Sequence, residues 1–560
     1  MRRLLPWALA GLLGLTLLPG LAAIEAIDWR EARDAHVTRE MLEGRDMLFP
    51  VHAGEPYFEK PLAGYGHEML ARAALRRIAP SATVRTEVAV SRAVRAALAA
   101  ALALLVAMIG ARCFGSRAGW LAACALASML GLPLAARCDG TQLLAALGAW
   151  LGIASLLAVR IGRSRAPDLY RVAAYVMLGA TALIGGPLSA LWPLGGFLLY
   201  ARLARGVTPR VSLGLGSGLL IMLGMQLPWY GLMTALHGKA FLSQIAFFPY
   251  AAETRGAWWA GPVMALSFTV VLAFPWTSLM GAAMRDAASR LRRAQPVGAD
   301  ASANPDHLSH ALVALIFAAS IPIALYPGPP LTAALPVLPG IALLCGRFLD
   351  RVLEGDIDST HLSSATRLTA IMGAVGALLM ETLGSQLPEA MMSLRLTGIA
   401  LLIGSAAPLL ADLRGARKLA AGLFALPIAL GSPIVLGRAL PELEHWLNTR
   451  EAAEAMLRAS PPLAPLVMPH EPPPSLRLLM PRNLIVAPTL DRLTERAGRD
   501  GRVYVAFRPS READVARSIE APLEILMRSP ALVLARAQVL PPPRQRPDPA
   551  PTTTSESGRR

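Results

Sequence analysis

Long apolar segments alternate with short polar segments along most of the chain. An apolar segment of about 17 to 25 residues can cross the hydrocarbon core of a bilayer as one helix. This pattern predicts an all-α polytopic membrane protein with about 13 spanning helices. The predicted spans are residues 1–23, 93–111, 118–135, 141–159, 170–186, 187–201, 211–230, 257–280, 309–326, 329–346, 368–385, 393–411 and 419–437.

The first apolar segment, residues 1–23, has two interpretations. Arg2 and Arg3 precede an apolar run that ends in small residues at Ala22 and Ala23, which is the pattern of a cleaved signal peptide. We favour an uncleaved first span, because the basic residues of the later loops then alternate consistently from one side to the other.

Composition and charge agree with a membrane protein. Hydrophobic residues make up 54% of the chain and charged residues 16%, whereas soluble domains carry about 25% charged residues. The formal net charge is +16, from 54 basic and 38 acidic residues. The basic residues gather in alternate loops, which argues against a nucleic-acid partner and follows the positive-inside rule. These basic loops are at residues 112–117, 160–171, 202–210, 285–293, 347–351 and 414–418.

The alternation predicts an orientation. The N-terminus lies in the cytoplasm, and the first loop and the C-terminus lie outside it. The heavy use of arginine and alanine is typical of a GC-rich bacterial genome, so we expect the cytoplasmic membrane of a bacterium. The four cysteines, Cys113, Cys124, Cys138 and Cys345, show no CxxC spacing, so neither a disulfide framework nor a zinc site is expected.

Changes in polarity predict the domain boundaries. Residues 1–440 form a transmembrane domain, in which residues 24–92 are a large first loop with interfacial helices. Residues 441–540 form a small extracytoplasmic α/β domain, and residues 541–560 form a disordered tail rich in Pro, Ser, Thr and Arg. The pattern of the small domain predicts a linker at Ser460–Pro474, strands at Asn483–Ala487, Arg502–Phe507 and Ala531–Ala535, and helices at Arg492–Ala497 and Arg511–Met527.

Charge is almost absent from the centres of the predicted spans, so polar chemistry is expected in the loops. The first half of the first loop, residues 27–42, reads as a helix at the membrane interface with Trp29 as an anchor. Asp28 and Glu31 stand three residues apart at its start. This spacing is typical of a capping box, and the capping interpretation is favoured over a catalytic carboxylate at either position.

The second half of the first loop contains Gly54–Pro61. Pro61 forces Lys60 out of helical geometry, which places a cation beside Glu59 at a turn close to the bilayer. Lysine occurs only three times in the chain, and an ammonium in this place could bind a phosphate as a point charge. The alternative is a solvated Lys–Glu pair that contributes little.

Two further features are predicted on the same side of the membrane. Arg137 and Asp139 lie at the outer end of the third span, where a structural ion pair is the favoured interpretation. Glu253 follows an aromatic stretch and could face a substrate. The aromatic stretches, which suit an interfacial belt, are Leu227–Tyr230, Phe247–Tyr250 and Phe274–Trp276.

In their order and spacing these motifs resemble the polyprenyl-phosphate-dependent GT-C glycosyltransferases, the group that contains lipid A aminoarabinose transferase and the protein O-mannosyltransferase-like enzymes. The resemblance covers roughly residues 1–280 and implies a GT-C-like transmembrane domain. The matching segments are Arg30–Arg33, Arg39–Leu42, Gly54–Pro61, Arg137–Asp139, Pro228–Tyr230 and Pro275–Trp276.

The chain departs from the family pattern at three places. Arg30 stands where the family has an acid, so Asp28 or Glu31 would have to replace that carboxylate. The family's T-K-G-P segment reads Ile184-Gly185-Gly186-Pro187 here, without its lysine. Pro249 stands where some members have a metal-binding histidine, so the sequence assigns no metal ligand. No cofactor is predicted, and use of a divalent metal stays open.

The resemblance implies an inverting transfer of a sugar from a polyprenyl phosphate to a lipid, glycan or protein acceptor on the outer face. Its partners would be the bilayer, the donor and the acceptor. The implied catalytic residues are Asp139, Glu31 and Asp28, which would orient or deprotonate the acceptor. The residues implied to bind the lipid phosphate are Lys60, Arg33 and Arg137, and those implied to contact other parts of the substrate are Tyr57, Glu59 and Glu253.

Two other classes of function are open at this point. A transporter or flippase of lipid-linked sugars is usually built from inverted repeats with polar residues at mid-membrane, and the sequence shows neither. A non-catalytic membrane scaffold that uses the small C-terminal domain for binding stays possible because of the acid missing at Arg30.

Overall fold

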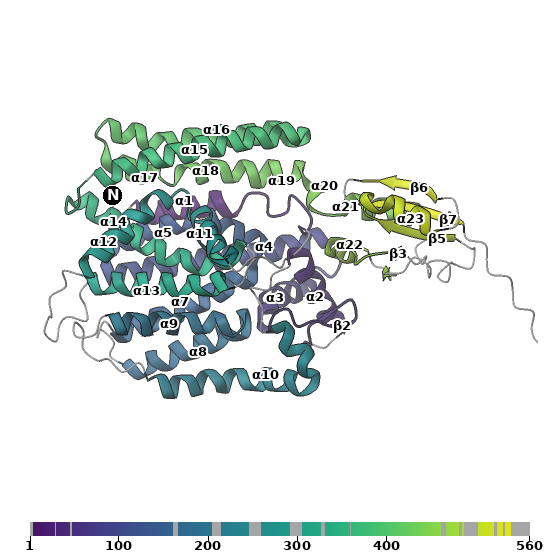
Figure 1. The fold of residues 1–560 in the computed structure, drawn as a ribbon, viewed down its shortest axis with the longest axis horizontal. Coiled ribbons are helices and arrows are strands. Elements are labelled where there is room, and N and C mark those ends of the chain that lie inside the picture. Colours follow the sequence, from purple (N-terminus) through teal and green to yellow (C-terminus); the bar gives the residue numbers. More distant parts are fainter. Residues whose placement is uncertain are drawn as a thin grey trace, which may run out of the picture. The chain divides into compact units, whose positions relative to one another are not determined.

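The computed structural model divides into two compact units, Met1–Glu444 and His445–Arg560. The first unit is mostly helical and contains one short β-hairpin, and a small sheet with helices makes up the second (Figure 1). The structure describes residues 4–27, 30–44, 47–160, 166–203, 214–245, 259–291, 305–325, 331–358, 360–460, 466–480, 484–486, 502–519, 523–529 and 532–538.

The polytopic all-α architecture is confirmed. Within the described residues, eight helices are long and apolar enough to cross a membrane, or up to ten if each of two bent helix pairs counts as one span. The eight are α4 (Val84–Phe114), α7 (Gly140–Arg160), α10 (Leu215–Ile245), α13 (Pro305–Leu325), η2 with α14 (Leu331–Val337, Leu338–Glu354), α15 (Thr360–Gln386), η3 with α16 (Pro388–Ala390, Met391–Leu413) and α17 to α19 (Arg417–Leu423, Leu426–Ile434, Leu440–Glu442).

The remaining apolar helices account for the other predicted runs. Two bent pairs turn by 54° and 111°, and three shorter helices complete the set. The pairs are α5 with α6 (Ser116–Ala127, Gly131–Cys138) and α11 with α12 (Ala260–Leu272, Thr277–Leu291), and the shorter helices are α1 (Leu5–Leu17), α8 (Pro167–Gly185) and α9 (Pro187–Leu203). Every predicted run thus falls on a helix wherever it is described, while the count of 13 spans stays a prediction.

Small residues let the central helices approach closely. A Cβ added at Gly119 in α5 would lie 2.4 Å from the Ala107 carbonyl oxygen of α4. One added at Gly346 in α14 would lie 2.5 Å from the Ala122 amide nitrogen of α5. Membrane helices pack largely through such small residues, because lipid provides no hydrophobic driving force between helices. Helix α5 therefore packs closely against both α4 and α14.

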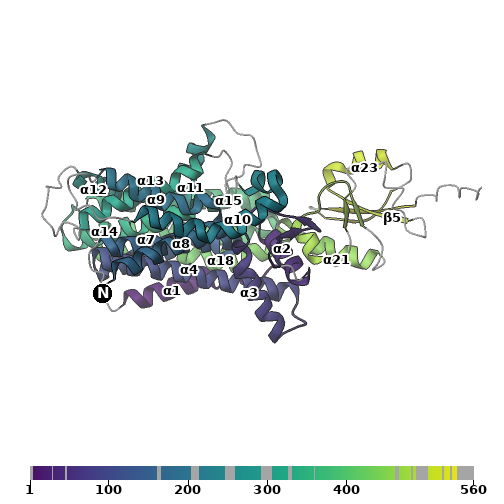
Figure 2. The same ribbon diagram turned by 90° about the horizontal axis from the view of Figure 1, so that it is seen from below.

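The described parts of the predicted first loop form a layer at one end of the bundle. It contains α2 (Arg30–Gly44), a hairpin of β1 (Val51–His52) and β2 (Glu55–Pro56), and α3 (Ala63–Ile78). The hairpin turns through Ala53 and Gly54, both with positive φ, as a two-residue turn requires. Helices α2 and α3 lie side by side in both views (Figures 1 and 2).

Helix α4 begins earlier than its apolar run. The side chain of Thr83 accepts a hydrogen bond from the Thr86 amide, which caps the helix before Val84. The helix therefore extends about two turns beyond the predicted start at residue 93. Those turns carry Arg92 and its neighbours into the loop layer.

The second unit is a mixed five-stranded sheet with the order β4-β3-β5-β7-β6. Strand β3 pairs in parallel with β4 and β5, and β7 pairs antiparallel with β5 and β6. The strands are β3 (Leu466–Met468), β4 (Leu484–Val486), β5 (Arg502–Phe507), β6 (Leu523–Arg528) and β7 (Val533–Gln538), and the helices are α20 (Glu444–Leu447), α21 (Arg450–Ala459), α22 (Pro474–Leu479) and α23 (Glu512–Ser518).

Two predictions for this unit are corrected. The predicted linker Ser460–Pro474 contains β3, an interior strand of the sheet whose side chains are fully buried. The predicted helix Arg511–Met527 ends at Ser518, and strand β6 follows. Pro522 explains the second error, because proline cannot continue a helix interior and restricts the residue before it. The predicted helix Arg492–Ala497 lies outside the described residues.

Candidate functional site

A small charged hollow lies in the loop layer of the first unit. It is small, with a cavity volume of about 10 Å³, which is room for about one water molecule. Helix α2, the segment before α3 and the start of α7 supply its walls. The lining residues are Arg30, Arg33, Asp34, Glu59, Lys60 and Thr141.

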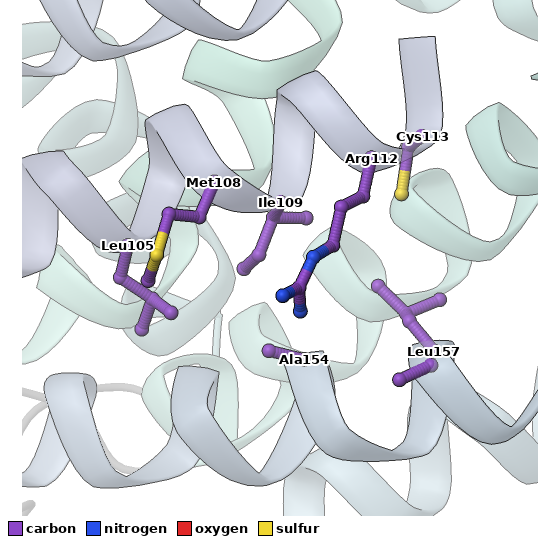
Figure 3. A pocket seen from close by; sticks show the side chains of 8 residues that line it. Leu105, Met108, Ile109, Arg112, Cys113, Ala154 and Leu157 are labelled. Atoms are coloured by element: carbon purple, nitrogen blue, oxygen red, sulfur yellow. The ribbon is translucent and has the colours of Figure 1, made fainter. Parts of the chain in front are cut away.

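A second hollow, between α4 and α7, is apolar and has a different character (Figure 3). Its cavity volume is about 40 Å³, and Arg112 is the one charged residue among the described residues that line it. Arg112 and Arg92 are separated by 20 residues of one helix, which is about 30 Å, or the thickness of a bilayer core. The apolar hollow is therefore remote from the charged one, and its lining offers no carboxylate for chemistry.

Lys60 is the central cation of the charged hollow. Its side chain is buried, and Nζ lies 2.5 Å from Oδ2 of Asp34 and donates to Thr141 Oγ1 at 2.9 Å. The ammonium also lies 4.4 Å from the centre of the Tyr65 ring, in cation–π geometry. Burial raises the pKa of Asp34 to about 6, although Lys60 acts in the opposite direction. Lys60 stands just before α3 and outside it, as Pro61 predicts.

A second ion pair lies beside the first. Arg33 Nη1 donates to Glu59 Oε2 at 3.0 Å and to the Tyr57 hydroxyl at 3.1 Å. Both side chains of this pair are about one-third exposed or less. The structure therefore brings together four residues that the sequence analysis assigned to substrate binding, namely Lys60, Arg33, Tyr57 and Glu59.

Arg30, the departure from the family pattern, pairs with Asp139. The guanidinium Nη1 lies 3.0 Å from Oδ2, and Thr332 donates to the same oxygen at 2.8 Å. The other oxygen, Oδ1, accepts from the Gln142 amide at 3.0 Å. Asp139 is buried and its two oxygens are both engaged, so its contacts suit a structural role that joins α2, α7 and η2. The proposal that it orients the acceptor stays a prediction.

Glu31 is buried among arginines and does not line the hollow. It accepts from Arg92 at 3.0 and 2.7 Å and also from Arg95. Burial alone would raise its pKa, but the two guanidinium groups outweigh that effect and hold the pKa at about 2. Glu31 Oε2 also accepts the Ile27 amide at 2.9 Å, so the carboxylate reaches back across the helix start. Asp28, the other half of the predicted capping box, lies outside the described residues.

The other site residues of the sequence analysis lie elsewhere. Arg137 is buried and donates to the Leu17 and Pro19 carbonyl oxygens after α1, so the structure does not bring it to the charged hollow. Asp28 and Glu253 lie outside the described residues, as does Pro249. Within the described residues, no group of three or more His, Cys, Asp or Glu side chains could hold a metal ion, and we derive no step through a metal.

Three lining residues were not assigned to the site from the sequence, namely Asp34, Thr141 and Arg30, of which Arg30 was named only as a departure from the family pattern. Helical spacing could have identified Asp34, because residues 30, 33 and 34 share one face of a helix. Thr141 could not have been found, because only the tertiary contact between α7 and the first loop brings it to Lys60.

Gly140 supports the loop layer through a close approach to His67. A Cβ added at Gly140 would lie 2.1 Å from His67 Nε2 and 2.9 Å from Arg95 Cδ. Overpacking of this kind costs about 1–3 kcal/mol, so we expect Gly140→Ala to lower the thermal midpoint of the purified protein. Gly224→Ala in α10, where nothing lies within 4 Å of the added atom, is the control. Equal midpoints for the two variants would contradict the prediction.

The bundle and its charged hollow define a multi-pass membrane protein with an ionic site in a loop layer at one end. The chain is similar to two crystal structures of ArnT from Cupriavidus metallidurans. With the apo state the TM-score is 0.75, at 17% identity, over 95% of this chain and 97% of that one. With the undecaprenyl phosphate complex the TM-score is 0.73, at 17% identity and the same coverage.

ArnT belongs to the GT-C glycosyltransferases that the sequence resembles, and the fold expected from that resemblance is confirmed. At this identity the likeness establishes the fold and does not establish the reaction. No protein-family model matches the chain, and no curated protein matches its sequence.

Proposed function

We propose that this protein is an inverting glycosyltransferase that moves a sugar from a polyprenyl phosphate to an acceptor on the outer face of the cytoplasmic membrane. The observation that carries the proposal is the charged hollow, where Lys60 and Arg33 meet at the end of an ArnT-like bundle. One of the similar structures holds undecaprenyl phosphate, which is a ligand of the class that such a donor would release.

Lys60 and Arg33 bind the phosphate of the donor. Each cation is held by a carboxylate, Asp34 for Lys60 and Glu59 for Arg33. An ammonium has three N–H donors, and the contacts of Lys60 within the described residues reach two oxygens. A phosphate oxygen can take the third, and the guanidinium of Arg33 can bind a second phosphate oxygen with fixed geometry.

The reaction requires stabilisation of charge on the leaving group. A polyprenyl phosphate sugar is a phosphodiester with one negative charge, and the departing polyprenyl phosphate carries a second. Cations placed beforehand beside that developing charge lower the barrier without reorganisation. Because Lys60 is buried, its interaction with the phosphate is screened less than it would be in water.

The proposal includes the topology of the sequence analysis. The N-terminus lies in the cytoplasm, the loop layer and the second unit lie outside it, and about 13 segments span the membrane. The loop layer is then next to the outer leaflet, where the lipid tail of the donor can stay in the bilayer while its phosphate enters the hollow.

A transfer assay tests the proposal. Purified protein in proteoliposomes is given a panel of radiolabelled sugars on undecaprenyl phosphate, with water and a total lipid extract of a bacterial envelope as acceptors. We expect release or transfer of at least one sugar, together with binding of undecaprenyl phosphate. Movement of an intact donor between leaflets without cleavage would support a flippase instead, and neither binding nor transfer would support a scaffold.

A further inference from the structure

We infer that Asp34 is the general base of the reaction, and that its protonation by a hydroxyl acceptor frees Lys60 for the departing lipid phosphate. This inference rests on the proposed sugar transfer and adds the acceptor class, because an acceptor phosphate would need no base. The sequence motifs do not include Asp34, and the argument for it comes from the contacts of the hollow.

The contacts of the carboxylates distinguish Asp34 from the other candidates. Glu31 receives hydrogen bonds from two arginines and an amide, and both oxygens of Asp139 are engaged. Asp34 lines the hollow and pairs with Lys60 through Oδ2 alone. In the part of the chain that the structure describes, Oδ1 accepts no hydrogen bond. This oxygen is also not fully buried. Oδ1 is thus open to an acceptor.

Glu59 is the other carboxylate in the lining, and it differs from Asp34 in burial. Its side chain is 32% exposed, against 12% for that of Asp34. A carboxylate out of water binds a proton more readily, because desolvation disfavours its charged form. Asp34 is therefore the more strongly desolvated of the two carboxylates.

The charged surroundings of Asp34 support this assignment. Burial raises the pKa of Asp34 to about 6, Lys60 lowers it, and Glu68 and Asp139 raise it again. A general base works best when its pKa lies near the working pH. The groups around the hollow are Glu59 and Lys60 from the segment before α3, Tyr65 and Glu68 from α3, Asp139 from the junction of α6 and α7, and Arg30 and Arg33 from α2.

The step balances in atoms and charge. The acceptor oxygen forms a bond to the anomeric carbon, and the bond from that carbon to the phosphate oxygen breaks with its electron pair on the phosphate. The acceptor proton moves to Oδ1 of Asp34. Neutral Asp34 attracts the Lys60 ammonium less than the carboxylate did. The ammonium therefore interacts more strongly with the leaving phosphate while the second negative charge develops there. One ion pair thereby couples deprotonation of the acceptor to stabilisation of the leaving group.

The Asp34→Asn variant tests the inference in the proteoliposome assay. We expect transfer to fall by about 10²–10⁴-fold, as for the loss of a general base. Wild-type kcat/KM should fall as the pH drops below about 6, where Asp34 becomes protonated. The residual activity of the variant should lack this acid limb. Asp168→Asn, at an exposed aspartate of α8, is the control and should behave as wild type.

Binding of undecaprenyl phosphate separates a base from a residue that only positions Lys60. The Asp34→Asn variant lacks the carboxylate that competes with the lipid phosphate for Lys60. It should therefore bind undecaprenyl phosphate as tightly as wild type or more tightly, and such binding also shows that the variant is folded. Weaker binding in proportion to the lost activity, or an unchanged acid limb, would overturn the inference.

Failure of the inference and failure of the proposed function give different results. If wild type and the Asp34→Asn variant are equally active, the role of Asp34 is refuted and the proposed transferase function stands. A wild type that neither binds undecaprenyl phosphate nor cleaves any donor removes both.

Discussion

Replacement of Lys60 by alanine is expected to lower sugar transfer by about 10²–10³-fold, the usual cost of removing one group that stabilises developing negative charge. Lys60 is buried in the hollow and is held by Asp34 and Thr141, so its ammonium meets the phosphate in a place that water screens weakly. The measurement is initial transfer rate and undecaprenyl phosphate binding in the same proteoliposomes, and both should decline.

A matched lysine controls this experiment. Lys239 lies exposed on α10, and Lys239→Ala should transfer as wild type does. Lys60→Arg retains the charge in a larger, planar group, and we expect partial recovery of binding with less recovery of rate, because arginine and lysine are not interchangeable at a tightly held site. Wild-type transfer by Lys60→Ala in folded protein would show that the hollow is not the phosphate site.

Replacement of Glu31 by glutamine is expected to destabilise the protein by about 3–5 kcal/mol, the cost of breaking a buried ion pair from one side. Glu31 is the shared partner of Arg92 and Arg95, which are both about 1% exposed. Without the carboxylate, the positive charges of two buried guanidinium groups are offset by less negative charge. The measurement is the thermal midpoint and the yield of folded protein in detergent.

The control for Glu31 is an exposed ion pair. Glu381 pairs with Arg395 on the surface of the bundle, where both side chains are about half exposed, and Glu381→Gln should leave the midpoint unchanged. A Glu31→Gln midpoint equal to that of the control would contradict the structural role. Transfer by Glu31→Gln, where the protein is folded, reports separately on the predicted catalytic role.

The pH dependence of this contribution has a definite sign. The pKa of Glu31 is lowered from 4.5 to about 2 by the two arginines, against the effect of burial. A carboxylate with a depressed pKa adds stability above its unfolded pKa, and this stability is lost as the pH falls through the folded pKa. We therefore expect the difference between wild type and Glu31→Gln to be full above pH about 4.5 and to shrink toward pH 2.

Part of the candidate site was predictable from the sequence. The rarity of lysine, with Pro61 after Lys60, drew attention to the segment where the central cation of the hollow lies. The spacing of Asp28 and Glu31 favoured a capping box, which stays a prediction because Asp28 lies outside the described residues, while Glu31 accepts the Ile27 amide. Expectations of this kind depend on residues close together in the chain, so a sequence alone can carry them.

The partners of these residues were not predictable. Arg30 meets Asp139 across 109 positions, and Lys60 meets Thr141 across 81 positions. Helix α2 also presents Asp34 to the hollow, a residue to which no motif pointed. A single sequence carries no direct signal for such pairs, because each depends on how helices that are distant along the chain pack together.

The sequence by itself determined that the chain is a membrane protein, where its apolar helices lie and which loop is rich in charged residues. Those features follow from local hydropathy and backbone restriction, which act over one or two turns of chain. Only the tertiary structure decided which carboxylates pair with buried arginines and which carboxylate keeps an accessible oxygen beside Lys60. That choice is made by desolvation and by ion pairs between distant segments, which exist only once the bundle has closed around them.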